Sequence, residues 1–220
     1  MSQDIVIVPA RKSSKGLPNK HHKFVGTKSL IERTFDTCKD LGLKTYILTD
    51  DPKIKALTEY YEDFDASYNR PSSLSDDGSN VVDLISHYLN MQDFTYPVNI
   101  ILLQPTNPFR DVNEIQNALS WFKKNRLKSL AFYGEPLIEP NDCFAIEKDR
   151  FVLDKYKEGR QKKVVKKFIS GECYICNSNH LLKTGSFVDK ETFAWQSKNW
   201  RGSIDIDYLF QLELANSVAT

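Results

Sequence analysis

The chain has 220 residues and a mass of 25.4 kDa, with 40% hydrophobic and 27% charged residues. This is enough for one globular domain with a full core, and the net charge of +1 gives no strong field toward nucleic acid or an anionic membrane. The apolar stretches are too short to span a bilayer and residues 1–4 lack a basic signal-peptide start, so we expect a cytoplasmic protein without a nucleic-acid or membrane partner.

The first predicted element is a short β-branched strand over residues 5–9, which opens directly into a polar loop. This loop contains Arg11, Lys12, Lys15 and Lys20 and no acidic residue. The carboxyl ends of buried parallel strands are where α/β folds bind ligands. Four cations at such an end favour a highly charged anion, with a nucleoside triphosphate as the common candidate. A solvated basic turn is the alternative.

Strand-like and helix-like runs then alternate along the chain. Helices are predicted over 29–41, from residue 52, over 79–90 and over 112–122. Strands are predicted over 44–48, 99–103, 129–133 and 172–176, and after a loop a last strand–helix pair begins at residue 203. This order predicts an α/β fold, a doubly wound and mainly parallel sheet.

The alternation breaks over residues 134–168, which are rich in charge and contain only short β-like pieces. We interpret this stretch as a protruding β arm and a dimerisation contact. No linker is long enough to divide the chain, so residues 1–220 are predicted to form a single domain.

Two cysteines, Cys173 and Cys176, have the spacing of a metal-binding or redox pair. Residues three apart on a strand face opposite sides of a sheet, so the two thiols should diverge. Buried reduced cysteines are therefore the prediction.

Several familiar motifs are missing, among them the P-loop, the dinucleotide-binding glycine fingerprint, the zinc-protease motif and the hydrolase nucleophile elbow. Their absence argues against ordinary P-loop hydrolases, dinucleotide oxidoreductases and serine hydrolases. What remains is a set of polar loops, each of which follows an apolar strand.

The loop before the last helix contains two carboxylates, Asp205 and Asp207. On an extended segment they point the same way and can together hold a hard cation such as Mg²⁺. A cation would also allow two neighbouring carboxylates to stay ionised. Alternatively, Asp207 is the N-cap of the closing helix.

Three further positions have side chains suited to a ligand. Arg70 can fork onto a phosphate or a base, and Arg160 onto a carboxylate. The amide of Gln104 both donates and accepts, which suits a sugar or a pyrimidine. The turn at residues 76–79 is expected to cap the next helix, whose N-terminus favours an anion or a base edge. Arg110 is equally explained as a surface residue at a helix entry.

Taken in order, these motifs resemble the acylneuraminate cytidylyltransferases and the related octulosonic-acid cytidylyltransferases. The matching pieces are Pro9-Ala10-Arg11, Ser14-Lys15-Gly16-Leu17-Pro18 with Lys20, Thr49-Asp50, Arg70-Pro71, Leu102-Leu103-Gln104-Pro105-Thr106 with Pro108 and Arg110, Gly171 with Tyr174-Ile175, and Ser203-Ile204-Asp205-Ile206-Asp207.

The resemblance implies a nucleotide-diphospho-sugar transferase-like fold and a homodimer whose partner arm covers the active site. It also implies roles for individual residues. Arg11, Lys15 and Asp207 would be catalytic, and Asp205 and Asp207 would bind Mg²⁺. Gln104, Arg160 and Tyr174 would face the sugar. CTP would be held by Ala10, Arg11, Ser14, Lys15, Lys20, His21, Arg70, Asp77, Ser79 and Asn80.

Some residues depart from the family pattern. His21 stands where the family usually has Asn, and Ser170 stands where Asn usually precedes Gly171. Asn107 and Phe109 stand where Ser and Leu are usual. These departures bear on the identity of the sugar more than on the reaction.

The implied reaction is attack by the anomeric hydroxyl of an acidic 2-keto sugar on the α-phosphorus of CTP, with release of pyrophosphate. Sialic, legionaminic and pseudaminic acids are all candidates, which suggests capsule or lipopolysaccharide biosynthesis. The alternatives are a GT-A-like glycosyltransferase that uses a nucleotide-sugar, and a non-catalytic nucleotide-binding homologue.

Overall fold

The computed structural model describes residues 3–14, 16–76, 78–92, 94, 97–136, 145–147, 150–152 and 167–219, with 145–147 and 150–152 described by their backbone. The strands are β1 (Gln3–Ala10), β2 (Phe24–Val25), β3 (Lys28–Ser29), β4 (Thr45–Thr49), β5 (Phe64–Asp65), β6 (Val98–Leu102), β7 (Ser129–Gly134), β8 (Ala145–Glu147), β9 (Arg150–Val152), β10 (Phe168–Asn177) and β11 (Phe193–Gln196). The α-helices are α1 (Leu30–Leu41), α2 (Pro52–Thr58), α3 (Val81–Asn90), α4 (Val112–Lys124), α5 (Ser178–Thr184) and α6 (Leu209–Ser217). Short 3₁₀ helices are η1 (Lys20–His22), η2 (Ser72–Leu74) and η5 (Trp200–Ser203).

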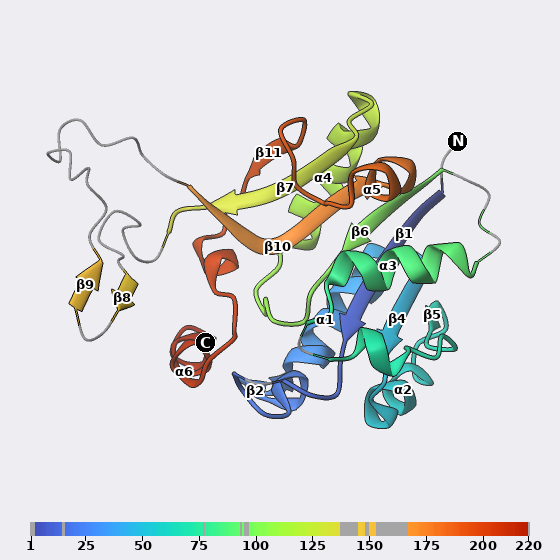
Figure 1. The fold of residues 1–220 in the computed structure, drawn as a ribbon. Helices are drawn as coiled ribbons and strands as arrows, with labels where there is room; N and C mark the ends of the chain where they lie inside the picture. Colours follow the sequence, from blue (N-terminus) through green and yellow to red (C-terminus); the bar gives the residue numbers. More distant parts are fainter. Residues whose placement is uncertain are drawn as a thin grey trace, which may run out of the picture.

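The core of the fold is a seven-stranded sheet in the order β11-β7-β10-β6-β1-β4-β5 (Figure 1). β1 pairs in parallel with both β4 and β6, and β5 and β11 also join in parallel. β10 runs antiparallel between β6 and β7. The prediction of a mainly parallel α/β sheet is therefore confirmed.

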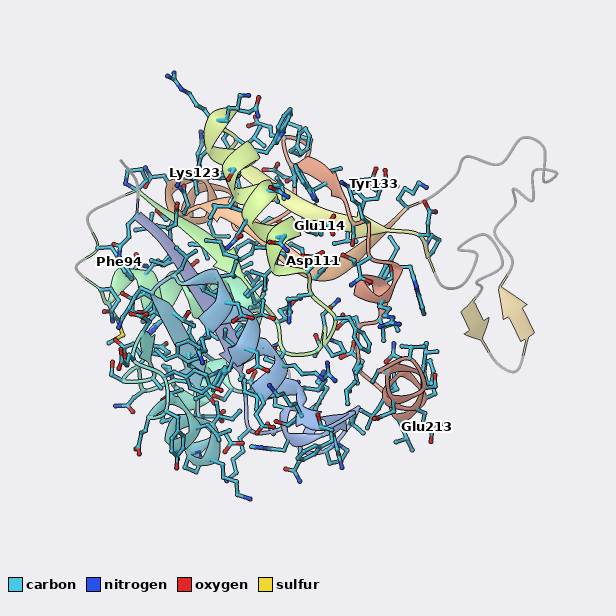
Figure 2. The ribbon with its side chains drawn as sticks, turned by 180° about the vertical axis from the view of Figure 1, so that it is seen from behind. Phe94, Asp111, Glu114, Lys123, Tyr133 and Glu213 are labelled. Atoms are coloured by element: carbon cyan, nitrogen blue, oxygen red, sulfur yellow. The ribbon has the colours of Figure 1, made fainter. Side chains whose placement is uncertain are left out.

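Helices cover both faces of this sheet, because its central strands are apolar on both sides. α3 and α5 lie on one face and pack on side chains such as Ile5, Ile7 and Ile100 (Figure 1). α1 and α4 cover the other face, seen from behind in Figure 2, and pack on Val6 and Val8. Alternate residues of β1 thus enter two separate cores.

The predicted helices form where local chemistry supports their ends. Ser29 caps α1 in a reciprocal box with Glu32, and Gly42 ends that helix with a φ of 63°. Asp51 caps α2 ahead of Pro52. The predictions at 29–41, from 52, at 79–90 and at 112–122 are confirmed to within two residues at each boundary compared.

The interpretation of the cysteine pair is also confirmed. Cys173 lies in the core under α1 and α4, whereas Cys176 lies in the opposite core. Both are buried free thiols, and burial raises the pKa of Cys176 to about 12. Neither forms a metal or redox pair with the other.

The strand predicted from residue 203 is wrong. Ser203 ends η5, and residues 204–206 are extended without a strand partner. A backbone hydrogen bond, from the Ile206 N–H to the Thr106 carbonyl at 2.9 Å, ties this segment to the loop after β6. The segment lies against a loop rather than a strand edge, so no ladder can form.

The loop predicted after residue 176 is also wrong, because this stretch contains α5 and β11. Asn177 caps α5, and Gly185 ends it with a φ of 65°. α5 is one residue short of eight, and its apolar pattern is too brief to distinguish a helix from a loop.

Within the region predicted as an arm, β8 and β9 form an antiparallel two-stranded hairpin, which Figure 1 draws apart from the large sheet. Most other residues of 134–168 lie outside the described residues, so the dimerisation role stays a prediction. Among the helices that the structure describes, none is long and apolar enough to cross a membrane.

Candidate active site

The candidate site lies where β1, β4 and β6 end together. Because these strands are parallel and adjacent, the loops that follow them begin along one edge of the sheet. The Thr49 hydroxyl donates to the Ala10 carbonyl at 2.5 Å and joins the ends of β1 and β4. The basic loop, residue Asp50 and the loop that starts at Leu103 therefore share this edge.

A third, smaller hydrophobic cluster draws distant segments to this edge. It contains Leu17 from the basic loop, Phe109 from the loop after β6, and Ile204 and Ile206 from the segment before α6. Gly16 of the basic loop lies very close to the segment before α6, since a Cβ at this position would lie 2.5 Å from the Asp207 carbonyl oxygen. The basic loop therefore rests directly on the segment that contains both aspartates.

The contact that joins the two charged groups is an ion pair between Lys20 and Asp207. Their Nζ and Oδ1 atoms are 2.7 Å apart, although 187 positions separate them in the sequence. The Lys20 side chain is 11% exposed and that of Asp207 is 57% exposed. The structure thus brings a cation of the first loop and a carboxylate of the last loop to one place.

Asp205 lies deeper than Asp207. Its Oδ1 atom is buried and has no hydrogen-bond partner. Burial raises the pKa of Asp205, Asp207 raises it further, and Thr106, Lys20 and Arg110 oppose the shift. A buried, unpartnered carboxylate oxygen beside a second carboxylate is the arrangement that a divalent cation would stabilise.

These two carboxylates fit a cation that is also bound by a substrate. In the portion of the chain that the structure describes, no cluster of three or more His, Cys, Asp or Glu side chains could hold a metal ion. Mg²⁺ at this place would need further oxygens from water or from phosphate, as Mg²⁺ in nucleotide sites usually has.

Gly171 leaves room for the side chain of Asp205, because it has no Cβ of its own. Its φ is +73°, a conformation that other residues rarely adopt. A Cβ at this position would lie 3.4 Å from Asp205 Oδ2. Gly171 thus allows the backbone of β10 to pass close to the carboxylate.

The first residues of the basic loop bind neighbouring loops. The Arg11 guanidinium donates to the Asp76 carbonyl at 2.8 Å, and the Lys12 N–H donates to Asp50 Oδ1 at 2.7 Å. These bonds hold the start of the loop between the carboxyl end of β4 and the segment before α3. Ser14 is partly buried in the same loop.

Arg70 lies beside Arg11, but much of its guanidinium is engaged by the backbone. Its Nε and one terminal nitrogen donate to the Leu74 carbonyl at 3.0 and 2.6 Å. The other terminal nitrogen is 3.4 Å from the Leu48 carbonyl. Burial lowers the pKa of Arg70, and the Arg11 charge lowers it further. Arg70 therefore shapes this loop and adds positive charge to it.

The residue that caps α3 differs from the prediction. Asn80 is the N-cap, and its side chain accepts from the Val82 N–H at 2.9 Å. The Ser79 hydroxyl instead donates to the carbonyls of Leu74 and Asp76. The turn at 76–79 therefore precedes the cap rather than forming it, because the helix begins at Val81, two residues after the predicted start.

His21 is buried in η1 and bonds to the backbone of Arg11. Burial lowers the pKa of His21 to about 4, and the charges of Lys20 and His22 lower it further. The imidazole is therefore neutral near pH 7 and can offer a hydrogen bond but no charge. Next to it, His22 Nε2 lies 2.7 Å from Asp51 Oδ2.

The side of the site along β6 and β10 carries the residues that the resemblance assigns to the sugar. Tyr174 pairs with Leu102 across the sheet and packs edge-on against Phe187. Burial raises the pKa of Tyr174 to about 12, with a contribution from Asp205. Gln104 follows β6 in the adjacent loop and is partly buried.

The alternative interpretation of Arg110 as a surface residue is wrong. Its guanidinium donates to the carbonyls of Gln104, Asn107 and Glu172, and burial lowers its pKa. Arg110 folds back on the loop that contains it and fixes this loop against β10. Three predicted site residues, Lys15, Asp77 and Arg160, lie outside the described residues.

One residue that matters for this geometry was not among the predicted site residues. Asn107 is fully buried and bonds to two other segments, described below. Its signal in the sequence is an amide between two prolines in a loop, where a polar side chain has many possible partners.

Comparison with known proteins places these features in a family. Residues 5–185 match the family model described as "Cytidylyltransferase". An N-acylneuraminate cytidylyltransferase of Escherichia coli O18:K1:H7 is 30% identical over 97% of this chain and 51% of that protein. A CMP-N,N'-diacetyllegionaminic acid synthase of Legionella pneumophila is 26% identical over 92% of this chain and 90% of that protein. The chain thus spans about half the length of the N-acylneuraminate relatives it matches.

Solved structures show the same fold at low sequence identity. A CMP-2-keto-3-deoxy-manno-octonic acid synthetase complexed with CTP matches with a TM-score of 0.69 and 14% identity, over 99% of this chain and 98% of the other. A 4-diphosphocytidyl-2C-methyl-D-erythritol synthase matches with a TM-score of 0.71 and 8% identity, over 100% and 99% of the two chains. Since the family model covers most of its length, this chain belongs to the cytidylyltransferase family.

Proposed function

We propose that this protein transfers a cytidylyl group from CTP to an acidic nonulosonic sugar and releases pyrophosphate. The observation that carries the proposal is the 2.7 Å contact between Lys20 and Asp207. This contact supports the proposal, because it brings one cation of the basic loop to the carboxylate pair, and one triphosphate with its cation would bridge the two. Family membership supplies the nucleotide, since the described geometry alone suits any triphosphate.

The residues of this chain would act mainly by position and charge. Arg11, Lys15 and Lys20 would bind the triphosphate and stabilise negative charge as the pyrophosphate leaves. The neutral ring of His21 would offer a hydrogen bond to the base. Alignment of the sugar hydroxyl with the α-phosphorus would contribute much of the rate, since little covalent work falls to the protein.

Asp205 and Asp207 would hold Mg²⁺, which supplies charge neutralisation at phosphate oxygens and lowers the pKa of a bound hydroxyl. The unpartnered Oδ1 of Asp205 supports this assignment. Lys20 would then exchange its bond to Asp207 for one to a phosphate oxygen.

The sugar is proposed from the relatives. Several relatives are named N-acylneuraminate cytidylyltransferase, and a relative of similar length is named for legionaminic acid. Gln104 and Tyr174 would line the sugar side, and Arg160 would bind the sugar carboxylate. We also propose a homodimer in which the 134–168 arm of each chain covers the other's site.

The test is a pyrophosphate-release assay with CTP, Mg²⁺ and a panel of nonulosonic and octulosonic acids. We expect turnover with at least one nonulosonic acid, and none when ATP, GTP or UTP replaces CTP. Mass spectrometry should identify the CMP-sugar. Sugar transfer from a nucleotide-sugar without pyrophosphate release would instead indicate a glycosyltransferase. CTP binding without turnover of any sugar in the panel would indicate a non-catalytic homologue.

A further inference from the structure

Asn107 connects the loop after β6 to two other segments of the chain. The residue is fully buried, and its side-chain amide donates to the Ser170 carbonyl at 3.2 Å and to the Gly202 carbonyl at 2.5 Å. Its Oδ1 atom accepts from the Phe109 N–H at 3.3 Å. One side chain thus satisfies three backbone groups in three parts of the fold.

Both carbonyls lie just before residues of the carboxylate site. Ser170 precedes Gly171, the residue whose backbone passes closest to Asp205 Oδ2. Gly202 lies in η5, the turn that leads to Asp205 three residues later. The neighbouring Thr106 carbonyl accepts from the Ile206 N–H at 2.9 Å, so the same loop also holds the far side of Asp205.

We propose that Asn107 is a positioning residue that sets the place of the Asp205 carboxylate relative to β10. The two donors of its amide hold the backbone on both sides of that carboxylate, while Asn107 itself touches no predicted ligand of the metal. This inference rests on the proposed function, because the position of the Asp205 carboxylate matters only if that carboxylate binds the cation.

The burial of both residues supports the proposal. Asn107 and Ser170 are both buried, and the amide of the first donates to the carbonyl of the second. Without this amide, the carbonyls of Ser170 and Gly202 would lose their donor in the interior, so the backbone on both sides of Asp205 would shift.

Two substitutions at position 107 separate these effects. Asn107→Asp keeps the shape of the side chain but replaces its NH₂ group with a carboxylate oxygen. Both N–H donors are lost, and the new oxygen repels the two carbonyl oxygens. Asn107→Ser keeps one donor on a shorter side chain, so at most one carbonyl is satisfied. Asn113→Asp makes the same chemical change at an exposed position of α4 and serves as the matched control.

Each variant is measured for steady-state turnover with CTP and the sugar found above. We expect kcat to fall by roughly 100-fold in Asn107→Asp, the effect of a misplacement of about 1 Å, and less in Asn107→Ser. KM for CTP should stay near the wild-type value, because the side chain of Asn107 bonds to Phe109, Ser170 and Gly202 rather than to the described part of the basic loop. The control should match the wild type in both constants.

A second readout does not depend on activity. Mn²⁺ binding, followed by loss of the free-ion signal in electron paramagnetic resonance, should weaken in both Asn107 variants and stay unchanged in the control. Wild-type protein without turnover would contradict the proposed function but leave the Mn²⁺ comparison intact.

Three outcomes would overturn the inference. They are a folded Asn107→Ser protein with wild-type kcat and Mn²⁺ affinity, a loss confined to the KM for CTP, and failure of both variants to fold. The last would make the residue purely structural. Thermal melting, compared with the wild type, decides whether each variant is folded.

Discussion

At the scale of single residues, the Lys20–Asp207 ion pair contributes little to stability. Asp207 is largely exposed, and ion pairs of this kind contribute roughly 0–1 kcal/mol. The contact joins two loops that are far apart in the sequence but adds little stability, which agrees with the proposed role of both charges in binding the triphosphate and its cation. Asp205 adds a buried oxygen whose desolvation is not compensated by any hydrogen bond.

This leads to a prediction for Asp207→Ala. Removal of the carboxylate should lower kcat by about 100-fold or more, because the transition-state charge loses its cation. Unfolding midpoints in urea should stay close to those of the wild type. Asp36→Ala is the matched control, since Asp36 pairs with Lys28 at the same 2.7 Å on the surface away from the site. Near-normal turnover of the Asp207 variant would contradict the metal assignment.

Residue chemistry could be predicted from the sequence better than residue partners. The loop cations were predicted as site residues because charged side chains after a buried strand lie where α/β folds bind ligands, and the two aspartates because they were expected to point the same way on an extended segment. Partners could not be identified in the same way. Asn80 rather than Ser79 caps α3, and Arg110 turns inward to three carbonyls. Both outcomes depend on backbone positions that only the folded chain defines.

At the scale of elements, periodicity decided what could be predicted. α1, α3 and α4 have long apolar faces, and β1, β4 and β6 are continuous apolar runs, so each was expected. The segment 203–207 alternates like a strand but finds no strand edge beside it. Its extended shape comes from Ile204 and Ile206, which enter the third hydrophobic cluster with Leu17.

The position of the basic loop on this segment predicts the effect of Gly16→Ala. The added methyl would meet the Asp207 carbonyl at 2.5 Å, so the loop or the segment must shift. We expect KM for CTP to rise and kcat to fall together, because the loop cations and the two carboxylates would no longer be correctly placed relative to each other. Gly78→Ala, where the nearest atom would be 3.7 Å away, should leave both constants unchanged. Equal kinetics in the two variants would show that the loop is not held here.

At the scale of the whole molecule, β10 links the site to the core. It runs antiparallel between β6 and β7, carries Gly171 and Tyr174 to the site, and buries Glu172 completely. Both carboxylate oxygens of Glu172 are buried, and no described residue makes a hydrogen bond of good geometry to either of them. The side chain lies against Gly202 and feels the charge of Glu114, labelled on α4 in Figure 2.

This buried carboxyl makes global stability depend on pH. Burial raises the pKa of Glu172 to about 7, Glu114 adds to the shift, and Ser197 and Arg110 oppose it only in part. The folded-state pKa exceeds that of the unfolded chain, near 4.5, so the native state holds the proton more tightly. The associated stability is therefore fully present below about pH 4.5 and is lost as pH rises to about 7, by about 3 kcal/mol.

Glu172→Gln should remove this dependence, since an amide mimics the protonated acid at every pH. Urea unfolding of both proteins at pH 5, 6, 7 and 8 should give similar free energies at pH 5 and a more stable variant at pH 8. Glu213→Gln on α6, an exposed position labelled in Figure 2, should follow the wild type throughout. If the difference between Glu172→Gln and wild type is the same at all four pH values, Glu172 keeps its charge in the fold, and Arg110 rather than desolvation controls its proton.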